Sequence, residues 1–159
     1  MAFQTVDLCD QYRDAIRIVE PIFRSYGKHA AFCGAIQTVK CYEDNVLLKE
    51  TLSTPGNGRV LVADGGGSLR CALVGDMVAG IGAQHGWSGI VLYGCVRDIA
   101  AIADVEIGIR ALNHFPLPSI KRGEGVVGIP VTFGGVTFAP GQYLYADIDG
   151  IVVSDKALT

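Results

Sequence analysis

The chain has 159 residues, of which half are hydrophobic and 18% are charged. This length and composition predict one folded domain over residues 1–159 with a large core, and they exclude general disorder. The formal net charge is −3 and the basic residues form no stripe, so we do not expect direct binding to nucleic acid. No apolar run reaches the roughly 18 residues of a membrane span, and residues 1–7 do not resemble a signal peptide, so a cytoplasmic protein is expected.

The cysteines and histidines offer little chemistry. Five cysteines is an odd number, and none are spaced as C-x-x-C, which favours free thiols in a reducing compartment over disulfides or a zinc site. Cys95 lies near the candidate site described below, but no histidine is close to it in the sequence, so we interpret it as a core thiol. The three histidines are scattered, and none is spaced to share a metal with another.

The N-terminal quarter is predicted to contain one short helix and one strand. Thr5 is a candidate cap for a helix over residues 7–12. Residues 19–23 are expected to be extended, because the residue before a proline avoids the helical region. A strand is predicted over residues 31–41, in which Gly34 marks a bulge or a close contact.

A second helix is predicted over residues 43–52, and the turn-forming residues 54–58 end it. Glu43 and Asp44, at its start, are most simply capping or solvated acids. Either carboxylate could also reach a site from a neighbouring segment.

A strand–helix–strand unit follows, with strands predicted at residues 59–64 and 88–93. A short connection makes such strands parallel and puts both carboxyl ends at the same edge of the sheet. In open α/β sheets, ligands bind in the crevice beyond that edge. The glycine turn 64–68 and the pair Arg97-Asp98 come after these strands, and we expect them to form walls of one site.

The remaining third is predicted to be rich in β-strand. A short helix is expected over residues 99–103, a strand over 105–112 and a polar loop over 114–125. Hairpin turns are expected at Gly134-Gly135 and at Asp149-Gly150.

Residues 123–128 match the pattern G-x-G-x-x-G. The dinucleotide-binding fingerprint needs a strand before it and a helix after it, whereas here a polar loop precedes a β-branched run. We therefore interpret the segment as a turn from loop to strand. The outline is a mixed α/β domain with one parallel crossover unit and antiparallel hairpins, and it is not a doubly wound dinucleotide fold.

Two glycine segments allow alternative interpretations. The turn 64–68 lacks the Lys-Ser/Thr of a P-loop, so either it is a tight turn with unusual backbone angles or its glycines let a ligand approach closely. Gly75 and Asp76 lie inside a helix capped by Ser68, or they begin the helix themselves. In the second case the free N–H groups at the helix start would bind a carboxylate or phosphate, with Asp76 as a capping or supporting acid.

The pair Arg97-Asp98 is the strongest candidate for chemistry. In the simplest interpretation, Asp98 caps the following helix and Arg97 is a surface cation. In the alternative, the planar guanidinium of Arg97 binds a carboxylate or an enolate through two N–H groups, and Asp98 provides a hard oxygen ligand for Mg²⁺ or Mn²⁺. The apolar strand before the pair and the helix start expected beside it favour the second interpretation.

Several motifs together resemble the RraA-like family, which includes a regulator of ribonuclease E activity and metal-dependent aldolases that cleave 4-hydroxy-4-methyl-2-oxoglutarate. The resemblance runs nearly from end to end, and the motifs are specific in combination rather than singly. They are residues 7–10 (DLCD), 19–21 (VEP), 38–41 (TVKC), 43–45 (EDN), 62–68 (VADGGGS), 93–98 (YGCVRD), 133–136 (FGGV) and 145–147 (YAD).

The resemblance implies a three-layer β/β/α domain of the swivelling type with mixed sheets, assembled as a homotrimer with sites near subunit interfaces. In the enzymes of the family, a G-D-x-x segment binds substrate through backbone amides, an arginine contacts the oxo acid, and the next aspartate binds a divalent metal. The matching residues are Gly75, Asp76, Met77 and Val78, then Arg97, then Asp98. The longer aldolases have extra C-terminal sequence that completes the site from a neighbouring subunit, whereas this chain ends at Thr159.

Two hypotheses remain open. The first is a divalent-metal lyase that cleaves 4-hydroxy-4-methyl-2-oxoglutarate to pyruvate and decarboxylates oxaloacetate through the same pyruvate enolate, with Asp98 as metal ligand and Arg97 on the enolate. Aldol cleavage also needs a base, for which we consider a water oriented by Asp76; decarboxylation does not, and is expected to be the more robust activity. The second is a non-catalytic regulator that binds and inhibits ribonuclease E. The presence of Asp98 favours the lyase, because a pure regulator needs no acid beside Arg97.

Overall fold

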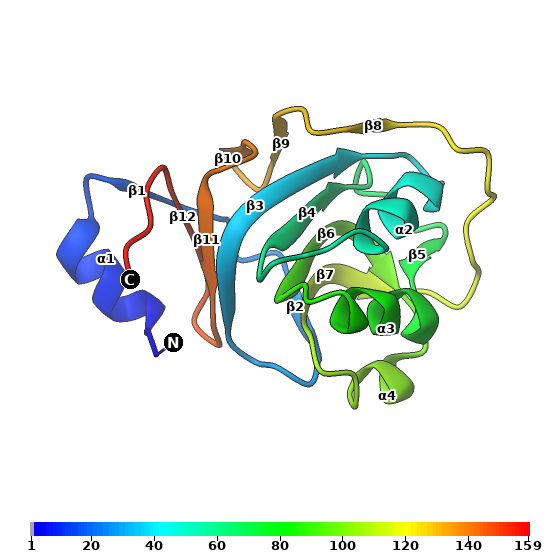
Figure 1. Ribbon diagram of the computed structural model, residues 1–159, viewed down its shortest axis with the longest axis horizontal. Helices are drawn as coiled ribbons and strands as arrows, with labels where there is room; N and C mark the ends of the chain where they lie inside the picture. The colour runs from blue at the N-terminus through cyan, green and yellow to red at the C-terminus, as the bar shows by residue number, and fades with distance from the viewer. Residues whose placement is uncertain (1) are drawn as a thin grey trace.

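The computed structural model describes residues 2–159, in which one long strand, β3 (Phe32–Lys40), links two β layers. Its first four residues pair antiparallel with β11 (Tyr143–Ala146), and residues 36–40 pair parallel with β4 (Val60–Asp64). Figure 1 shows β3 curving from one layer into the other. Gly34 lies in the first half of β3, where a Cβ would stand 2.1 Å from a backbone carbonyl oxygen. The close contact expected at Gly34 is therefore confirmed.

The inner layer is a mostly parallel sheet. Beside β4 lie β6 (Gly89–Val96), then β7 (Gly108–His114) and, antiparallel at the edge, β2 (Arg24–Gly27). The short strand β5 (Ala72–Val74) pairs with the end of β6. All residues of β4 are buried, as expected of a parallel strand that is covered on both faces.

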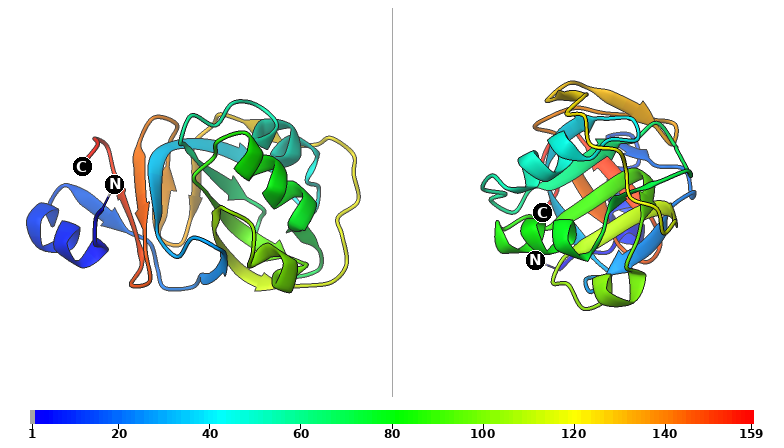
Figure 2. Two further views of the ribbon diagram at one scale, coloured as in Figure 1. Left: turned by 60° about the horizontal axis from the view of Figure 1, so that its bottom comes forward. Right: turned by 90° about the vertical axis from the view of Figure 1, so that its right-hand side faces the viewer.

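Three helices cover one face of this sheet (Figures 1 and 2). They are α2 (Val46–Leu52), α3 (Asp76–Gln84) and α4 (Ile99–Ile102). The core between these helices and the strands contains large, fully buried side chains, each of which stabilises the fold by roughly 1.5–3 kcal/mol. They include Leu48, Leu52, Leu61, Ile90, Leu92, Ile102 and Ile109.

The outer β layer packs on the opposite face. Strand β11 pairs with β12 (Ile151–Ser154), and β12 pairs with β1 (Ile16–Ile18). Helix α1 (Thr5–Tyr12) lies outside this layer, and both ends of the described chain are on that side (Figure 1). A second core between the layers includes Val62, Val91, Phe138 and Leu144.

A small hairpin closes the top of this second core. It is formed by β9 (Val131–Phe133) and β10 (Val136–Phe138), and a two-residue strand, β8 (Val126–Val127), precedes it along the end of β3. Phe133 of the hairpin stacks on Tyr93 of β6, with ring centroids 4.9 Å apart. The hairpin therefore anchors the loop that leads to it against the carboxyl end of the inner sheet.

Much of the predicted outline is confirmed. The domain is a three-layer mixed α/β fold, β4 and β6 are parallel with a helix between them, and the strand over 31–41 is β3. Both hairpin turns occur where Gly134-Gly135 and Asp149-Gly150 predicted them, between β9 and β10 and between β11 and β12. Gly86 has φ +80° just after α3, as expected of a glycine at a helix C-terminus.

Two helix starts were predicted wrongly. Helix α1 already includes Thr5, whose hydroxyl does not cap it but donates to Asp147 Oδ1 at 2.6 Å. Helix α2 begins at Val46 rather than at residue 43, because Asp44 Oδ1 accepts the Val46 N–H at 3.0 Å and Glu43 has φ +54°. The start of α1 is set by the long-range contact with Asp147, and the start of α2 by the local carboxylate of Asp44.

The strands β1, β2 and β5 were not predicted. Each has only three or four residues, which is too short for an alternating pattern to be recognised. The strands expected at 88–93 and 105–112 run further along the chain, as β6 to Val96 and β7 to His114. The pair Arg97-Asp98 therefore follows directly on the end of β6.

The cysteines are all free, as predicted. Cys95 is buried, and burial raises the pKa of its thiol, which agrees with a core role. Within residues 2–159, the helices are too short or too polar for any of them to cross a bilayer.

Candidate active site

The start of helix α3 lies at the carboxyl edge of the inner sheet. Strand β5 leads into Gly75, which has extended backbone angles (φ −116°, ψ −168°) and occupies the N-cap position before Asp76. The interpretation in which a helix runs from Ser68 through Gly75 is wrong, because β5 occupies residues 72–74. The alternative, a helix that begins at Gly75-Asp76, is confirmed.

The end of β6 is fastened to the same place. The Arg97 N–H donates to Val74 O at 2.9 Å, so the residue after β6 lies beside the residue before Gly75. Asp98 then extends its carboxylate toward helix α3, where Oδ2 accepts the Asp76 N–H at 3.3 Å. Asp98 Oδ2 is also 3.9 Å from Arg97 Nε. The structure thus brings Gly75, Asp76, Arg97 and Asp98 together, and we call this group, with Met77 and Val78, the α3–β6 site.

Asp98 has an unusual backbone. Its φ of 57° and ψ of 42° lie in the left-handed region, which residues other than glycine, asparagine and aspartate rarely adopt and which costs free energy for any residue with a Cβ. It occupies the N-cap position of α4 as predicted, but its side chain makes no cap hydrogen bond to that helix. The side chain is directed to α3 instead, so capping α4 does not explain the residue.

Gly75 makes room for this carboxylate. A Cβ at residue 75 would lie 2.6 Å from Asp98 Oδ2 and 3.4 Å from Arg97 Cγ. Any other residue would push the carboxylate away from the helix start. The need for glycine here is one of space, since the backbone angles of Gly75 are open to other residues.

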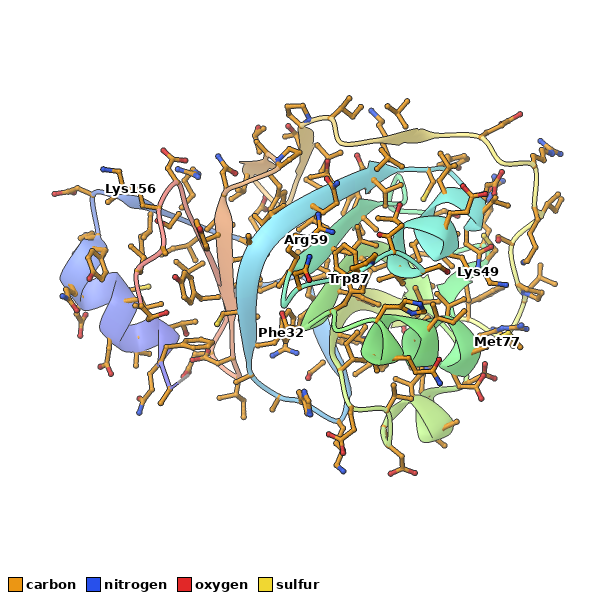
Figure 3. The ribbon with its side chains drawn as sticks, viewed as in Figure 1. Phe32, Lys49, Arg59, Met77, Trp87 and Lys156 are labelled. Carbon is orange, nitrogen blue, oxygen red and sulfur yellow. The ribbon has the colours of Figure 1, made fainter. Side chains whose placement is uncertain are left out.

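The α3–β6 site is open to solvent. The side chains of Arg97 and Asp98 are 41% and 42% exposed, and Met77 is 70% exposed. Figure 3 shows Met77 at the N-terminal end of α3, on the outer edge of the molecule. The Met77 N–H is engaged by Asp76 Oδ1 at 2.9 Å. The helix dipole adds a partial positive charge at this end, so Arg97 and the first amides of α3 form an anion-binding surface next to a carboxylate.

The donor set fits only one kind of metal. Within residues 2–159, no three His, Cys, Asp or Glu side chains are grouped so as to hold a cation between them. Asp98 offers a single exposed carboxylate, with Asp76 next to it. Such a set suits Mg²⁺ or Mn²⁺, which bind through one or two carboxylates and take their other oxygens from water and ligand. It does not suit a zinc site closed by three or four protein ligands.

A large cavity lies elsewhere along the same edge. It has a volume of about 830 Å³ and lies at the carboxyl ends of β3 and β4, beside Gly66 of the glycine turn. Its lining does not include Gly75, Arg97 or Asp98. We call it the large cavity; it is lined by residues 40–44, 64, 66, 70, 71, 93, 117, 118, 120, 122, 124–126 and 132. The glycine turn therefore forms a wall of this cavity and makes no hydrogen bond to the Arg97-Asp98 pair.

An ion pair between Glu43 and Arg70 lies in the wall of the large cavity. Glu43 accepts two hydrogen bonds from Arg70, at 2.7 and 2.8 Å, and one from Ser68 at 2.6 Å. The hydrogen bonds from Arg70 and Ser68 lower the pKa of Glu43. This ion pair joins the glycine turn to the start of α2. It was not predicted, because residues 43 and 70 are distant in the sequence and share no pattern.

Asp44 links a second pair of segments. It is almost completely buried, and its Oδ2 accepts the N–H groups of Arg122 and Glu124 at 2.9 and 3.0 Å, while Oδ1 accepts the Val46 N–H at the start of α2. Burial works to raise the pKa of this carboxyl, but the backbone donors outweigh it and the pKa is lowered. Asp44 therefore holds the loop 115–125 in place. The sequence indicated a capping or solvated acid at this position, but not its contact with this loop.

Residues 123–128 form the turn from loop to strand that the sequence predicted. Gly123, Gly125 and Gly128 all have positive φ, and the two-residue strand β8 lies between the last two. No helix begins there, so the segment lacks the structure that binds a dinucleotide.

These features define a class of protein: a three-layer α/β domain with an arginine, a carboxylate and a helix start meeting at one sheet edge. The sequence matches the RraA-like family, Aldolase/RraA, over residues 5–153. The chain belongs to the RraA-like family.

Three comparisons illustrate this membership. A protein of Aromatoleum aromaticum named "Putative 4-hydroxy-4-methyl-2-oxoglutarate aldolase" is 56% identical over 158 residues, which is 99% of each chain. A solved structure from Geobacillus kaustophilus, described as an S-adenosylmethionine:2-dimethylmenaquinone methyltransferase, has a TM-score of 0.96, 46% identity and coverage of 98% and 97% of the two chains. The RNA-processing inhibitor RraA from Thermus thermophilis has a TM-score of 0.96 and 39% identity over 100% of this chain and 96% of its own. The two solved structures share the fold of this chain, and the three proteins carry three different functional names.

Proposed function

We propose that this protein is a divalent-metal-dependent lyase that cleaves 4-hydroxy-4-methyl-2-oxoglutarate to pyruvate and decarboxylates oxaloacetate. The observation that carries the proposal is the meeting of Arg97, Asp98 and the first amides of α3 at one point. Both reactions need one site that binds a carboxylate and stabilises a pyruvate enolate. The name shared by relatives such as the Aromatoleum protein supports the same substrate class.

Each residue has a distinct task in this proposal. Asp98 would hold the cation, which supplies an electrophile for the 2-oxo and carboxylate oxygens of the substrate. Arg97 is fixed at its backbone by Val74 O, and its guanidinium would bind the carboxylate and the charge that develops on the enolate oxygen. The first N–H groups of α3, those of Asp76, Met77 and Val78, would orient the substrate carboxylate at the positive end of the helix, with the Met77 N–H released from Asp76 Oδ1.

The two reactions differ in their need for a base. In aldol cleavage, the C4 hydroxyl loses its proton, the C3–C4 bond breaks, and its electron pair becomes the enolate of one pyruvate while C4 becomes the carbonyl of a second. We assign Asp76, which is exposed beside Asp98, to orient a water that takes this proton. Decarboxylation of oxaloacetate breaks the corresponding bond with loss of carbon dioxide and needs no base.

A homotrimer is part of this proposal. The α3–β6 site is open in one chain, although catalysis through charge stabilisation is most effective where water is excluded. Large apolar side chains are exposed on the same side of the inner sheet, namely Leu69 (52%), Met77 (70%), Leu117 (58%) and Ile120 (66%). A neighbouring subunit that covered them would also enclose the site. Light scattering should therefore give about 50 kDa, three times 16.8 kDa, and a monomer would contradict the trimer.

The decisive experiment measures pyruvate release from both substrates, with Mg²⁺, with Mn²⁺ and with EDTA. Oxaloacetate decarboxylates slowly with Mg²⁺ alone, so each assay needs a protein-free control and an Asp98→Asn control. We expect protein-dependent release that EDTA abolishes, faster with oxaloacetate than with the aldol substrate. Absence of metal-dependent release from either substrate would contradict the proposal.

The likeness to the Thermus RraA supports a second candidate, a regulator that binds and inhibits ribonuclease E. The net charge of −3 suits binding to a basic protein segment rather than to RNA. Inhibition of purified ribonuclease E by wild-type protein and equally by Asp98→Asn would establish this role independently of the lyase. Five free cysteines favour a reducing compartment for either activity, and we place the protein in the cytoplasm.

A further inference from the structure

The anion-binding end of α3 already holds a carboxylate, which belongs to the protein itself. Asp98 Oδ2 accepts the Asp76 N–H at 3.3 Å and lies 3.9 Å from Arg97 Nε. These are the donors closest to the position that the proposed function gives to the substrate carboxylate. In the protein alone, Asp98 therefore occupies part of the position that an oxo acid must enter.

The local structure directs Asp98 to this position. Its left-handed backbone turns the side chain away from α4, to which it makes no cap hydrogen bond, and Gly75 leaves the space in which Oδ2 sits. A strained conformation persists only where the surrounding structure maintains it. The Arg97 N–H to Val74 O hydrogen bond is one such constraint, because it fixes the residue before Asp98.

We infer that Asp98 is a specificity-determining residue: without a divalent cation its carboxylate blocks the anion position, so the site rejects simple carboxylates and admits acids that chelate a cation. The inference rests on the proposed function for the identity of the ligand. The carboxylate of the acid competes with the Asp98 carboxylate for the Asp76 N–H and Arg97. A cation instead binds the Asp98 carboxylate. When Asp98 turns to a cation, the Asp76 N–H and Arg97 become available to the acid.

This arrangement makes binding of cation and acid interdependent. An anion can bind only to the fraction of molecules in which Asp98 has moved away. Its apparent dissociation constant is therefore the intrinsic constant divided by that fraction. A cation that holds Asp98 away removes that penalty, so cation and chelating acid should strengthen each other's binding. A carboxylic acid that cannot chelate the cation gains only the removal of this penalty and none of the contacts to the cation.

The test measures oxalate binding to the full chain by calorimetry, in EDTA and in Mg²⁺. Oxalate is a planar chelating dianion that resembles the enolate of pyruvate. Two variants remove the rival carboxylate: Asp98→Asn keeps the size, and Asp98→Gly adopts the left-handed backbone freely. Asp104→Asn is the matched control, because it removes the same charge from an exposed position just after α4. In EDTA we expect both Asp98 variants to bind oxalate at least about tenfold more tightly than wild type, with Asp104→Asn unchanged.

A second measurement reports on the contact directly. Amide hydrogen exchange at Asp76, followed by NMR in EDTA, should be faster in Asp98→Gly than in wild type, because the N–H loses its acceptor. Equal oxalate affinity in EDTA for wild type and both Asp98 variants, or an equal gain in Asp104→Asn, would overturn the inference. Unchanged exchange at Asp76 would overturn it as well.

The outcomes separate this inference from the proposed function. If the Asp98 variants gain oxalate affinity in EDTA but wild type releases no pyruvate with any metal, the blocking role stands and the lyase proposal fails. If wild type is an active metal-dependent lyase and the EDTA affinities are equal, the lyase stands and Asp98 does not block the site.

Discussion

Two regions at the same sheet edge contrast sharply. Around the large cavity, two acids have partners within the chain: Glu43 is paired with Arg70, and Asp44 is buried and accepts backbone N–H groups. In the α3–β6 site, Arg97 and Asp98 are both exposed by about two fifths, and their closest approach is 3.9 Å. The first region has a cavity with internally bonded acids, and the second has solvent-exposed charges of opposite sign.

The contrast shows that cavity size does not locate the chemistry in this fold. A carboxylate whose hydrogen bonds are all satisfied within the chain has little capacity left to bind a ligand, and its loss is felt as lost stability. A strained, exposed carboxylate beside an arginine and a helix start contributes little to stability and is available to a ligand. Substitutions in the two regions should therefore have opposite signatures.

The largest effect is expected from Asp98→Asn. The change removes the charge that would hold the cation, so metal-dependent pyruvate release should fall about 100-fold or more, since a bound metal contributes several kcal/mol to such steps. The melting temperature should barely change, because asparagine tolerates the left-handed backbone and Asp98 does not cap α4 through its side chain. Full activity of Asp98→Asn, measured against Asp104→Asn, would show that Asp98 is not the ligand.

Arg97→Lys should have the next largest effect. Lysine keeps the charge but loses the planar fork, and the expected cost is about 2–4 kcal/mol of transition-state stabilisation if Arg97 acts as a donor to the enolate oxygen. The loss should appear in kcat/KM for both substrates, with an unchanged melting temperature. Normal kinetics combined with reduced stability in Arg97→Lys would contradict this prediction. Arg97 would then have a structural role, like that of the Glu43–Arg70 ion pair.

The third prediction concerns stability. Asp44→Ala leaves the partly buried N–H groups of Val46, Arg122 and Glu124 without their acceptor and should lower the free energy of unfolding by about 2–3 kcal/mol. Turnover per folded molecule should fall far less than in Asp98→Asn. Denaturant unfolding followed by circular dichroism measures the first quantity, and pyruvate release the second.

The contribution of Asp44 should also depend on pH. Because the backbone donors outweigh burial, its pKa in the folded protein is lower than the ordinary value of 3.8. The stabilisation is therefore fully present above the ordinary pKa and is lost as the pH falls through the folded pKa. The stability difference between wild type and Asp44→Ala should be constant from pH 5 to 7 and shrink below about pH 4. A difference that grew on acidification would contradict the assigned role.

The same contrast explains what the sequence could predict. Arg97-Asp98 follows a strand that the sequence predicted, so periodicity located this pair without knowledge of distant contacts. For Gly75-Asp76 the local pattern left two interpretations open, because the preceding strand β5 is too short to be recognised, and only the family resemblance favoured the helix start. The left-handed conformation of Asp98 and its contact with Asp76 depend on the packing of β5 against β6, which no local pattern encodes. The ion pair of Glu43 with Arg70 was missed for the same reason, because only the folded chain brings those residues together.

The smallest expected effect concerns the thiols of the large cavity. Cys41 and Cys71 line it, yet both are buried, and burial raises the pKa of Cys41 to about 12. At pH 8 only about one Cys41 in ten thousand would be a thiolate, the form that reacts with disulfide reagents. Titration of the native protein with Ellman's reagent should therefore modify the partly exposed Cys9 and Cys33 first, and all five thiols only after denaturation. Rapid modification of Cys41 would mean that the large cavity is an open reactive site. That result would contradict the structural role assigned to this region.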